Sequence, residues 1–568
     1  MQQRYPIIIK HDDTKDAVTR IRKAIAATPA GAPLDLTFEQ GTHAFQYERA
    51  AEQFCFIANN DEGLKRIAIH VADRDGVTID GNGSNFCTHG TVMPVLIERC
   101  RNVTLKNFTL DAASPFHCEA IVLASHDDGV DVEIPEGFPF EIVYGRLRLS
   151  MRGRASWEVD NILEFDAARR ETAYKVVDHY RIGQQLRVTE IGPRQLRFTA
   201  PFRGPRRPQV GNVLVLTGFG RHYPGIVLSD CTNVSIENVT IHQAGGMGVL
   251  AQGCDGVRLN RVRVTPSGGR MISTYADATH FVGCRGLIEI EDCIFENQMD
   301  DPLNIHGVYA TITRRVARDA VEVKLNHGQQ LGFNIARIGD RMELVRNTTL
   351  LTYHEAIVTN VDRINKEYVV VTFDGALPPD VRMSDAVGNL TWTPDVTIRR
   401  CVSRGNRARG FLVTTPGRVL IEDNYFHTPG PAVLITGDAN YWFESGAVRD
   451  VTIRNNEFDN CNYGVWGTGA IEFHPEVKPE HRNDRPYHRN VTIEDNRFIA
   501  FDPRLVTGWG VDGITIRGNT IIPSTAYAKP SDVSDEPFQL KDCRNVTIED
   551  NVTLQSRTEI TREPEPVA

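Results

Sequence analysis

The heptapeptide Asn490-Val-Thr-Ile-Glu-Asp-Asn496 occurs again, letter for letter, at residues 545–551. Close variants recur along most of the chain, in the order Gly76-Val-Thr-Ile-Asp-Gly-Asn-Gly, Asn102-Val-Thr-Leu-Lys-Asn-Phe-Thr-Leu, Asn233-Val-Ser-Ile-Glu-Asn-Val-Thr-Ile, Gly256-Val-Arg-Leu-Asn-Arg-Val-Arg-Val, Asp395-Val-Thr-Ile-Arg-Arg, Arg418-Val-Leu-Ile-Glu-Asp-Asn and Asp450-Val-Thr-Ile-Arg-Asn-Asn. The steps from Val234 to Val257, from Val396 to Val419 and from Val491 to Ile514 are each 23 residues. A unit that recurs in this way is typical of a repeat protein.

Each unit alternates apolar and polar residues, which is the pattern of a strand with one buried face. The Asn or Gly that follows suits a sharp corner with a left-handed backbone. One unit cannot bury its apolar face alone, whereas stacked coils can. We therefore predict an all-β fold, a right-handed parallel β-helix. An apolar stripe at helical spacing near Asp16–Ala26 predicts a helix that covers its first coil.

The repeat is interrupted twice by short alternating strands, which we interpret as two antiparallel, barrel-like β inserts. The expected divisions are an N-terminal cap with the first coils, the first insert, central coils that carry the acids described below, the second insert, and C-terminal coils with a tail. Their bounds are 1–126, 127–215, 216–307, 308–390 and 391–568. Two inserts that flank a few coils would form the walls of a cleft, where a ligand site is expected.

Bulk composition excludes several classes of protein. The net charge of −10 argues against nucleic acid as a partner, because phosphate binding requires a basic surface. No run of 18 apolar residues is present, so no membrane span is expected. The first residues lack the apolar stretch of a signal peptide, which leaves either the cytoplasm or export followed by trimming. A homo-oligomer is compatible with the sequence.

The 11 cysteines are an odd number for a disulfide framework, and no Cys-x-x-Cys pair suggests a structural zinc site. Five of them precede the first inward residue of a strand by three positions: Cys100, Cys231, Cys254, Cys284 and Cys543. We expect a buried ladder of small residues at one corner of the helix, since free cysteine behaves as a small hydrophobe. A metal or redox site is the alternative.

Three acids stand out in the central coils. Asp300 follows Asp277 by 23 residues, one coil length, and Asp301 follows directly. Stacked carboxyls repel one another, so one pKa rises while another stays low, and the site gains both an acid and a base. Paired carboxylates in a groove are typical of glycoside hydrolysis. The alternative is that these aspartates cap turns.

We expect Asp277, Asp300 and Asp301 to be the catalytic set, with no metal or other cofactor. Substrate-binding candidates are side chains that could hydrogen-bond or stack on a sugar: Arg270, His280, Asn304, His306, Arg407, Arg409, Trp442, Glu444 and Trp466. Either histidine is equally compatible with a structural role, and the tryptophans could fill packing gaps.

The motifs around these acids resemble family 110 of the glycoside hydrolases. They are Met271-Ile-Ser-Thr-Tyr-Ala-Asp-Ala-Thr-His-Phe, Asp300-Asp-Pro-Leu-Asn-Ile-His-Gly, Gly405-Asn-Arg-Ala-Arg-Gly and Gly437-Asp-Ala-Asn-Tyr-Trp-Phe-Glu-Ser-Gly. The resemblance implies an exo-acting α-1,3-galactosidase that inverts the anomeric centre, with blood-group-B-type or linear α-galactoside glycans as substrates.

Three alternatives remain. The first is a polygalacturonase-like hydrolase, because family 28 also places one aspartate a coil before a pair. The second is a polysaccharide lyase, although no lysine lies between Ala244 and Gly307 to act as its base. The third is a noncatalytic carbohydrate-binding β-helix, which would not need stacked acids.

For the mechanism, we expect Asp300 to be the general acid, its pKa raised by its neighbours, while Asp277 and Asp301 activate water. Pro302 restricts Asp301 to extended backbone, so we also expect a corner there that turns both acids toward the groove. Inversion favours an acid and a base whose carboxyls are roughly 6.5–9.5 Å apart.

Overall fold

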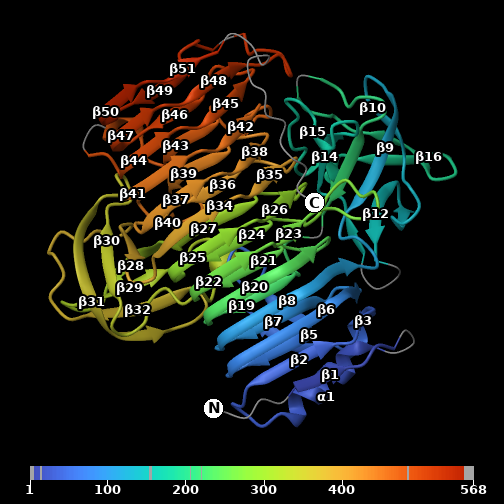
Figure 1. The fold of residues 1–568 in the computed structure, drawn as a ribbon, viewed down its shortest axis with the longest axis horizontal. Helices are drawn as coiled ribbons and strands as arrows, with labels where there is room; N and C mark the ends of the chain where they lie inside the picture. The colour runs from blue at the N-terminus through green and yellow to red at the C-terminus, as the bar shows by residue number, and fades with distance from the viewer. Residues whose placement is uncertain are drawn as a thin grey trace.

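The computed structural model describes residues 6–12, 16–151, 156–204, 206–218, 220–482, 485–531 and 533–554. Within these residues the chain forms a parallel β-helix, whose coils stack from the N-terminal end to the C-terminal end (Figure 1). Two long sheets, of 22 and 13 strands, make up its faces. The predicted fold class is confirmed.

The repeats align in register along the helix. Strand β20 (Thr232–Ile241) lies between β8 (Arg101–Ala112) and β22 (Asp255–Asn260), and all three are parallel. Val234 pairs with Val103 on one side and with Val257 on the other. These valines are at most 2% exposed, so each repeat adds one apolar rung to a continuous core.

The corner of each C-terminal coil has a left-handed backbone, although at the residue before the expected asparagine. Strand β37 (Arg418–Glu422) meets β38 (Tyr425–His427) at Asp423, whose φ is 58°. The same position on the other coils is held by Arg400, Asn455, Asp495, Gly518 and Asp550, all with positive φ. The chain can therefore turn within a single residue at this corner.

An asparagine ladder follows this corner. The Nδ2 of each residue donates to the Oδ1 of the next, over 2.9 Å from Asn424 to Asn456, 3.0 Å from Asn456 to Asn496, 3.0 Å from Asn496 to Asn519 and 2.8 Å from Asn519 to Asn551. The first four are almost fully buried. Since an amide both donates and accepts, each rung satisfies the next one.

The cysteine ladder occupies another corner. The thiols of Cys100, Cys231, Cys254 and Cys284 each donate to a carbonyl of the preceding coil, at 3.8, 3.5, 3.6 and 3.5 Å. All four are buried and free, whereas Cys543 is half-buried. The interpretation as small packing residues is supported, because burial raises the pKa of the Cys100 thiol to about 11.

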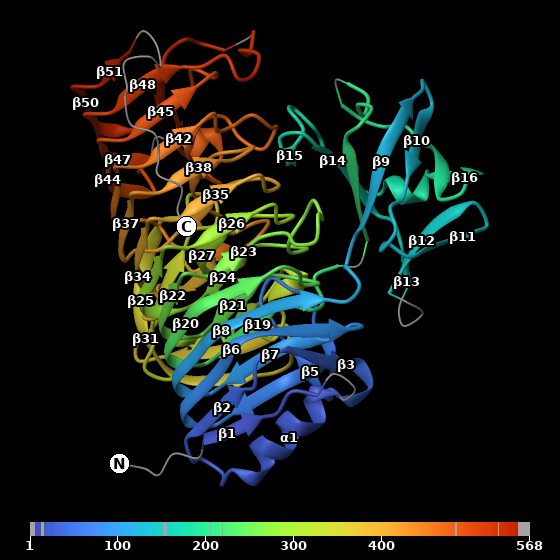
Figure 2. The same cartoon turned by 45° about the vertical axis from the view of Figure 1, so that its right-hand side comes forward.

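Helix α1 (Ala17–Ala27) lies against the first coil, at the N-terminal end of the stack (Figure 2). Asp16 is its N-cap, because the carboxylate accepts from the backbone N–H of Thr19 at 2.8 Å. Ala17, Val18, Ile21 and Ala24 form its buried face. The predicted cap helix is therefore confirmed. None of the helices in the described ranges is long and apolar enough to cross a membrane.

The two inserts lie on opposite sides of the stack in Figure 1 and are built of antiparallel strands. The second is a closed barrel of β28 (Ala310–Arg315), β29 (Ala320–Lys324), β32 (Tyr368–Phe373), β31 (Thr352–Arg363), β30 (Arg341–Val345) and β33 (Ala386–Asn389). The first insert contains one seven-stranded sheet. Its strand order is β15 (Glu171–Thr172), β14 (Asn161–Asp166), β18 (Val213–Thr217), β9 (Cys118–Ser125), β10 (Gly129–Glu133), β17 (Gln195–Thr199) and β16 (Arg187–Gly192). A three-stranded sheet of β11 (Phe140–Val143), β12 (Arg146–Ser150) and β13 (Ser156–Glu158) completes it.

Candidate active site

Three successive coils carry charged residues at one corner. Strands β24 (Thr279–Val282), β27 (Leu303–Val308) and β36 (Phe411–Val413) are parallel neighbours, and Thr279 pairs with Leu303, which pairs with Phe411. The turn before each strand holds Asp277, Asp301 or Arg409. Asp277 therefore lies on the coil next to the Asp300-Asp301 pair, as predicted, and its register partner within that pair is Asp301.

The structure brings the three predicted acids together. One carboxylate oxygen of each of Asp277, Asp300 and Asp301 lies within 4.8 Å of the other two. Their residues are only 2%, 6% and 1% exposed. The corner expected at Pro302 is present between β26 (Ile294–Glu296) and β27, and of its two acids Asp300 lines the cavity described below while Asp301 is 1% exposed. The wide separation expected of an inverting pair is not found among these three acids.

Arginines surround two of the acids. Asp300 accepts from Arg407 Nη1 at 3.0 Å and from Arg221, which binds its other oxygen. Asp301 accepts from Arg409 Nε at 3.0 Å and Nη2 at 2.6 Å, and from the Arg409 backbone N–H at 3.0 Å. These charge-assisted bonds fix the orientation of both carboxylates.

The arginines separate the pKa values of the acids. Burial opposes ionisation of Asp300, but Arg407 and Arg221 outweigh it and lower its pKa. Burial raises the pKa of Asp277 to about 7, with a further contribution from the charge of Asp300. Burial also raises the pKa of Asp301 to about 7, although Arg409 opposes it. The prediction of a raised pKa at Asp300 is therefore wrong, because the sequence did not reveal Arg221 and did not show that Arg407 binds Asp300.

A chain of hydrogen-bonding groups leads away from Asp277. Its Oδ2 lies 2.6 Å from Nδ1 of His280, and His280 Nε2 lies 2.9 Å from Nε2 of His306. Nδ1 of His306 lies 2.7 Å from the carbonyl oxygen of Gly307, and its Nε2 lies 3.5 Å from Oε1 of Glu444. Both imidazoles are buried, and burial lowers their pKa values, that of His280 to about 4.

A cavity of about 380 Å³ opens onto Asp300. Tyr180 and Asn161 line it from the first insert and Gln329 lines it from the second, so both inserts contribute walls, as predicted. Arg407 reaches across this cavity and also binds Asp178, at 3.0 Å from Nη2 to Oδ2. The indole N–H of Trp466 donates to the same Asp178 oxygen at 3.2 Å, which places Trp466 beside the site.

The remaining candidates have different surroundings. Asn304 pairs with His280 in register, and its buried Oδ1 has no hydrogen-bond partner among the described residues. Trp442 is 39% exposed and packs on the ring of His327, at 4.8 Å between ring centroids. Arg270 is not brought to the acids, because its guanidinium binds Asp111 at 2.6 Å.

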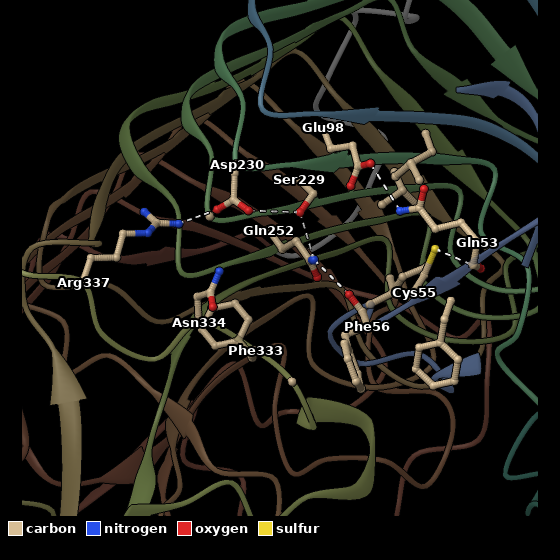
Figure 3. Close-up of a pocket in the computed structure, with 16 residues that line it drawn as sticks. Gln53, Cys55, Phe56, Glu98, Ser229, Asp230, Gln252, Phe333, Asn334 and Arg337 are labelled. Atoms are coloured by element: carbon tan, nitrogen blue, oxygen red, sulfur yellow. Dashed lines mark hydrogen bonds and ion pairs between the residues drawn. The ribbon is translucent and has the colours of Figure 1, made fainter. Parts of the chain in front are cut away.

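A second cavity, of about 220 Å³, lies nearer the N-terminal end (Figure 3). Its polar side chains mostly bind one another: Gln53 donates to Glu98 at 3.2 Å, Gln252 donates to Ser229 at 3.1 Å, and Arg337 binds Asp230. None of the sequence-predicted site residues lines it. We therefore assign the site to the cavity at Asp300.

Comparison with known proteins identifies relatives of this chain. An α-1,3-galactosidase A from Shewanella woodyi is 37% identical over 90% of this chain and 84% of its own. An α-1,3-galactosidase B from Bacteroides thetaiotaomicron is 34% identical over 96% of this chain and 89% of its own. Residues 118–214 match the GLAA-B beta-barrel domain I and residues 320–387 match domain II.

The chain belongs to the GLAA-B family of α-1,3-galactosidases. The resemblance to glycoside hydrolase family 110 is thus confirmed. Among solved structures, a family 28 exopolygalacturonase from Yersinia enterocolitica is 10% identical with a TM-score of 0.40, over 96% of this chain and 79% of its own. That similarity is too low to favour the polygalacturonase alternative.

The acid cluster of this galactosidase-family chain offers three oxygens that a cation could use. However, Arg221, Arg407 and Arg409 already bind Asp300 and Asp301. Three guanidinium groups beside the carboxylates would repel a metal ion. The donor set therefore fits direct acid–base chemistry better than it fits a metal centre.

Several residues of this site were missed from the sequence. Arg221 lies just after the first insert, Asp178 and Tyr180 lie within it, Gln329 lies within the second insert, and Asp61 lies in an early coil. None belongs to the repeat or to a recognisable motif. For four of these residues the available signal was their position inside, or at the edge of, a segment that interrupts the repeat, whereas Asp61 carried no such signal.

Proposed function

We propose that this protein is an exo-acting glycoside hydrolase that removes terminal α-1,3-linked galactose from blood-group-B-type or linear glycans and inverts the anomeric centre. The main observation behind this proposal is the cavity at Asp300, because residues of both inserts line it beside a cluster of three acids. A cavity walled on two sides suits the end of a glycan better than its middle. The names of the family relatives, α-1,3-galactosidases A and B, support the choice of sugar and linkage.

In the proposed reaction Asp277 is the general acid and Asp300 the general base. Asp277 holds its proton at pH values up to about 7, since burial raises its pKa to about 7. Its proton passes to the glycosidic oxygen as the bond from galactose C1 breaks and the electron pair moves to that oxygen. Water adds to C1 and gives its proton to Asp300, whose pKa is low enough to keep it ionised. Asp301 holds Arg409 against the acid cluster.

Stereochemistry is the most demanding part of this proposal. The carboxylate oxygens lie within 4.8 Å of one another, closer than the roughly 6.5–9.5 Å of typical inverting pairs. The attacking water must then sit beside the carboxyl pair rather than directly between the two groups. Inversion therefore rests on the family resemblance, and the anomer of the product decides it.

The test is proton NMR of the first product released from an α-1,3-linked galactosyl disaccharide. β-Galactose is expected, and α-galactose as the first product would overturn inversion. A panel of α-1,2-, α-1,3-, α-1,4- and α-1,6-galactosides tests the linkage, with release from the α-1,3 compound alone as the expected result. Release of oligosaccharides from inside a polymer would contradict the exo-acting assignment.

A further inference from the structure

A chain of buried side chains links Asp277 to the edge of the site. It runs from Asp277 through His280 on β24 and His306 on β27 to Glu444 on β40 (Glu444–Ser445). The two imidazole side chains are at most 1% exposed, whereas the Glu444 side chain is 10% exposed. The chain thus connects a buried carboxyl with a carboxylate that water can reach.

The hydrogen-bond partners define where the protons lie. The Gly307 carbonyl can only accept, so Nδ1 of His306 must carry a hydrogen. In the neutral ring its Nε2 then accepts, and Nε2 of His280 must donate to it. The Nδ1 of a neutral His280 is consequently an acceptor, and Asp277 must supply the proton of the 2.6 Å contact between them.

A second arrangement holds the same number of protons. If His280 Nδ1–H donates to an ionised Asp277, then His280 Nε2 accepts from His306 Nε2–H. His306 is then an imidazolium, and Glu444, 3.5 Å from it, is its counter-ion. Moving one proton across each of two hydrogen bonds converts one arrangement into the other, so the chain can carry a proton inward without any side chain leaving its place.

We propose that His280, His306 and Glu444 are positioning residues that keep the transferable proton on Asp277 and resupply it from the Glu444 side after each turnover. This inference rests on the proposed function of Asp277 as the general acid. After Asp277 has protonated the leaving oxygen, each imidazole keeps one hydrogen, and that of His280 exchanges from Nε2 to Nδ1, where it faces the ionised Asp277. A proton from water at the Glu444 end then binds His306 Nε2 and produces the second arrangement, from which one transfer across each hydrogen bond returns a proton to Asp277.

Other charges also act on this chain. Asp277 faces Asp300, Arg221 and Arg409 besides Glu444, and Glu444 accepts from Asn59 Nδ2 at 3.3 Å. His280 and His306 face Glu444, with Arg221 and Asp300 near the former. His327 also lies within reach of the charge of Glu444. The negative charge of Glu444 raises the pKa of Asp277 and of both imidazoles.

The kinetic test compares Glu444→Gln and His306→Gln with the wild type on an α-1,3-galactosyl disaccharide and on a 4-nitrophenyl α-galactoside. Only the disaccharide needs a proton on its leaving group, so kcat for it should fall about tenfold or more, against less than about threefold for the aryl substrate. Glu444→Gln should also move the alkaline limb of the disaccharide profile to lower pH, because the pKa of Asp277 falls with the loss of this charge.

The matched controls are Glu164→Gln and His488→Gln, which change buried residues of the same types that make no contact with the chain. Both should leave the ratio of the two substrate rates unchanged. Equal losses on both substrates with an unmoved pH profile would overturn the proposal and leave only a packing role. If His306→Gln fails to fold, the Glu444→Gln variant still decides, because it leaves both imidazoles in place.

A second measurement does not depend on activity. Nitrogen-15 NMR of histidine-labelled protein, assigned with His280→Gln and His306→Gln, should show the hydrogen of His280 on Nε2 and that of His306 on Nδ1 near neutral pH. The hydrogen of His280 on Nδ1 in a neutral pair would overturn the proposal. A wild type that releases galactose from neither substrate would instead refute the proposed function, so the two failures are distinguishable.

Discussion

Polar residues stack at two corners of the same β-helix, but their hydrogen bonds are satisfied in different ways. In the asparagine ladder, the side-chain amide of each rung before Asn551 donates to the next rung, and all five amides also donate to backbone carbonyls of neighbouring coils. At the acid corner Asp277 stacks on Asp301, and ionised carboxylates can only accept. The acid corner must therefore recruit donors from elsewhere, and it uses Arg409 from the next coil, and Arg221 and Arg407 for Asp300.

The difference shows that a corner of the β-helix can contribute either to stability or to chemistry. The amides of the ladder supply donors and acceptors to one another and to the backbone, so the ladder adds hydrogen bonds between neighbouring C-terminal coils. The acid corner depends on arginines from other segments, which lower the pKa of Asp300, whereas burial raises the pKa of Asp277. A site with an acid and a base side by side is the consequence.

Removing the charge of Asp300 should have the largest effect. Asp300→Asn keeps the shape but cannot accept a proton from water, so kcat/KM should fall about 10³-fold or more. The loss should be similar for the α-1,3-galactosyl disaccharide and for the 4-nitrophenyl α-galactoside, measured by galactose release at neutral pH. Near-normal hydrolysis of the aryl substrate by this variant would contradict the base role.

Asp277→Asn should be selective. It removes the proton donor, so kcat/KM for the disaccharide should fall about 10²-fold or more, while the aryl substrate should lose less than about tenfold. In the wild type, the disaccharide rate should fall as pH rises through about 7, where Asp277 loses its proton. An equal loss on both substrates would assign Asp277 to water activation instead.

Arg407→Met should shift the acid limb of the pH profile. Arg407 and Arg221 hold the pKa of Asp300 down, so losing one of them raises it and moves the acid limb of kcat/KM to higher pH. The value of kcat/KM at neutral pH should fall by a few tens of fold. Arg454→Met, which removes a partly exposed partner of Glu422 outside the site, serves as the control and should leave the profile unchanged.

The asparagine ladder should respond in stability rather than in activity. Asn456→Ala leaves buried amide and carbonyl partners unsatisfied on two neighbouring coils, and the free energy of unfolding should fall by roughly 3 kcal/mol. The denaturation midpoint measures this loss. At temperatures where the variant is folded, kcat/KM should stay within about twofold of the wild type, and a larger change would couple the ladder to the acid corner.

Arg270→Met should have the smallest effect on activity. Its guanidinium binds Asp111 and Ser267 rather than the acid cluster, so kcat/KM should change by less than about twofold. A small drop in melting temperature is expected, because a partly buried ion pair is lost. A tenfold rise in KM with an unchanged melting temperature would instead restore Arg270 to the substrate site.

The sequence predicted those parts of the molecule that depend on local pattern. The period of Val-x-Ile units specifies stacked coils, and Asp16 with the apolar stripe behind it specifies the cap helix. The three acids could be found because turn capping alone does not explain three aspartates on two neighbouring coils. Arg407 and Arg409 were found as well, since their motif lies in the coil that follows.

The electrostatics of the site could not be predicted in the same way. The pKa of Asp300 depends on Arg221, 79 positions earlier in the chain, and no pattern joins the two residues. The stacking of Asp277 on Asp301 depends on one extra residue in a single coil. Roles assigned from spacing alone therefore place the transferable proton on Asp300, whereas the arginine contacts of Asp300 support our proposal that Asp277 carries it.

The cysteine ladder has a consequence for how the β-helix opens. Cys100, Cys231, Cys254 and Cys284 stand on four successive coils that lead up to the acid corner, and each thiol is shielded from solvent. A thiol reagent can reach one of them only when its own coil separates from the neighbouring coil. The order in which the four thiols become labelled would therefore show which coil of the native β-helix opens first.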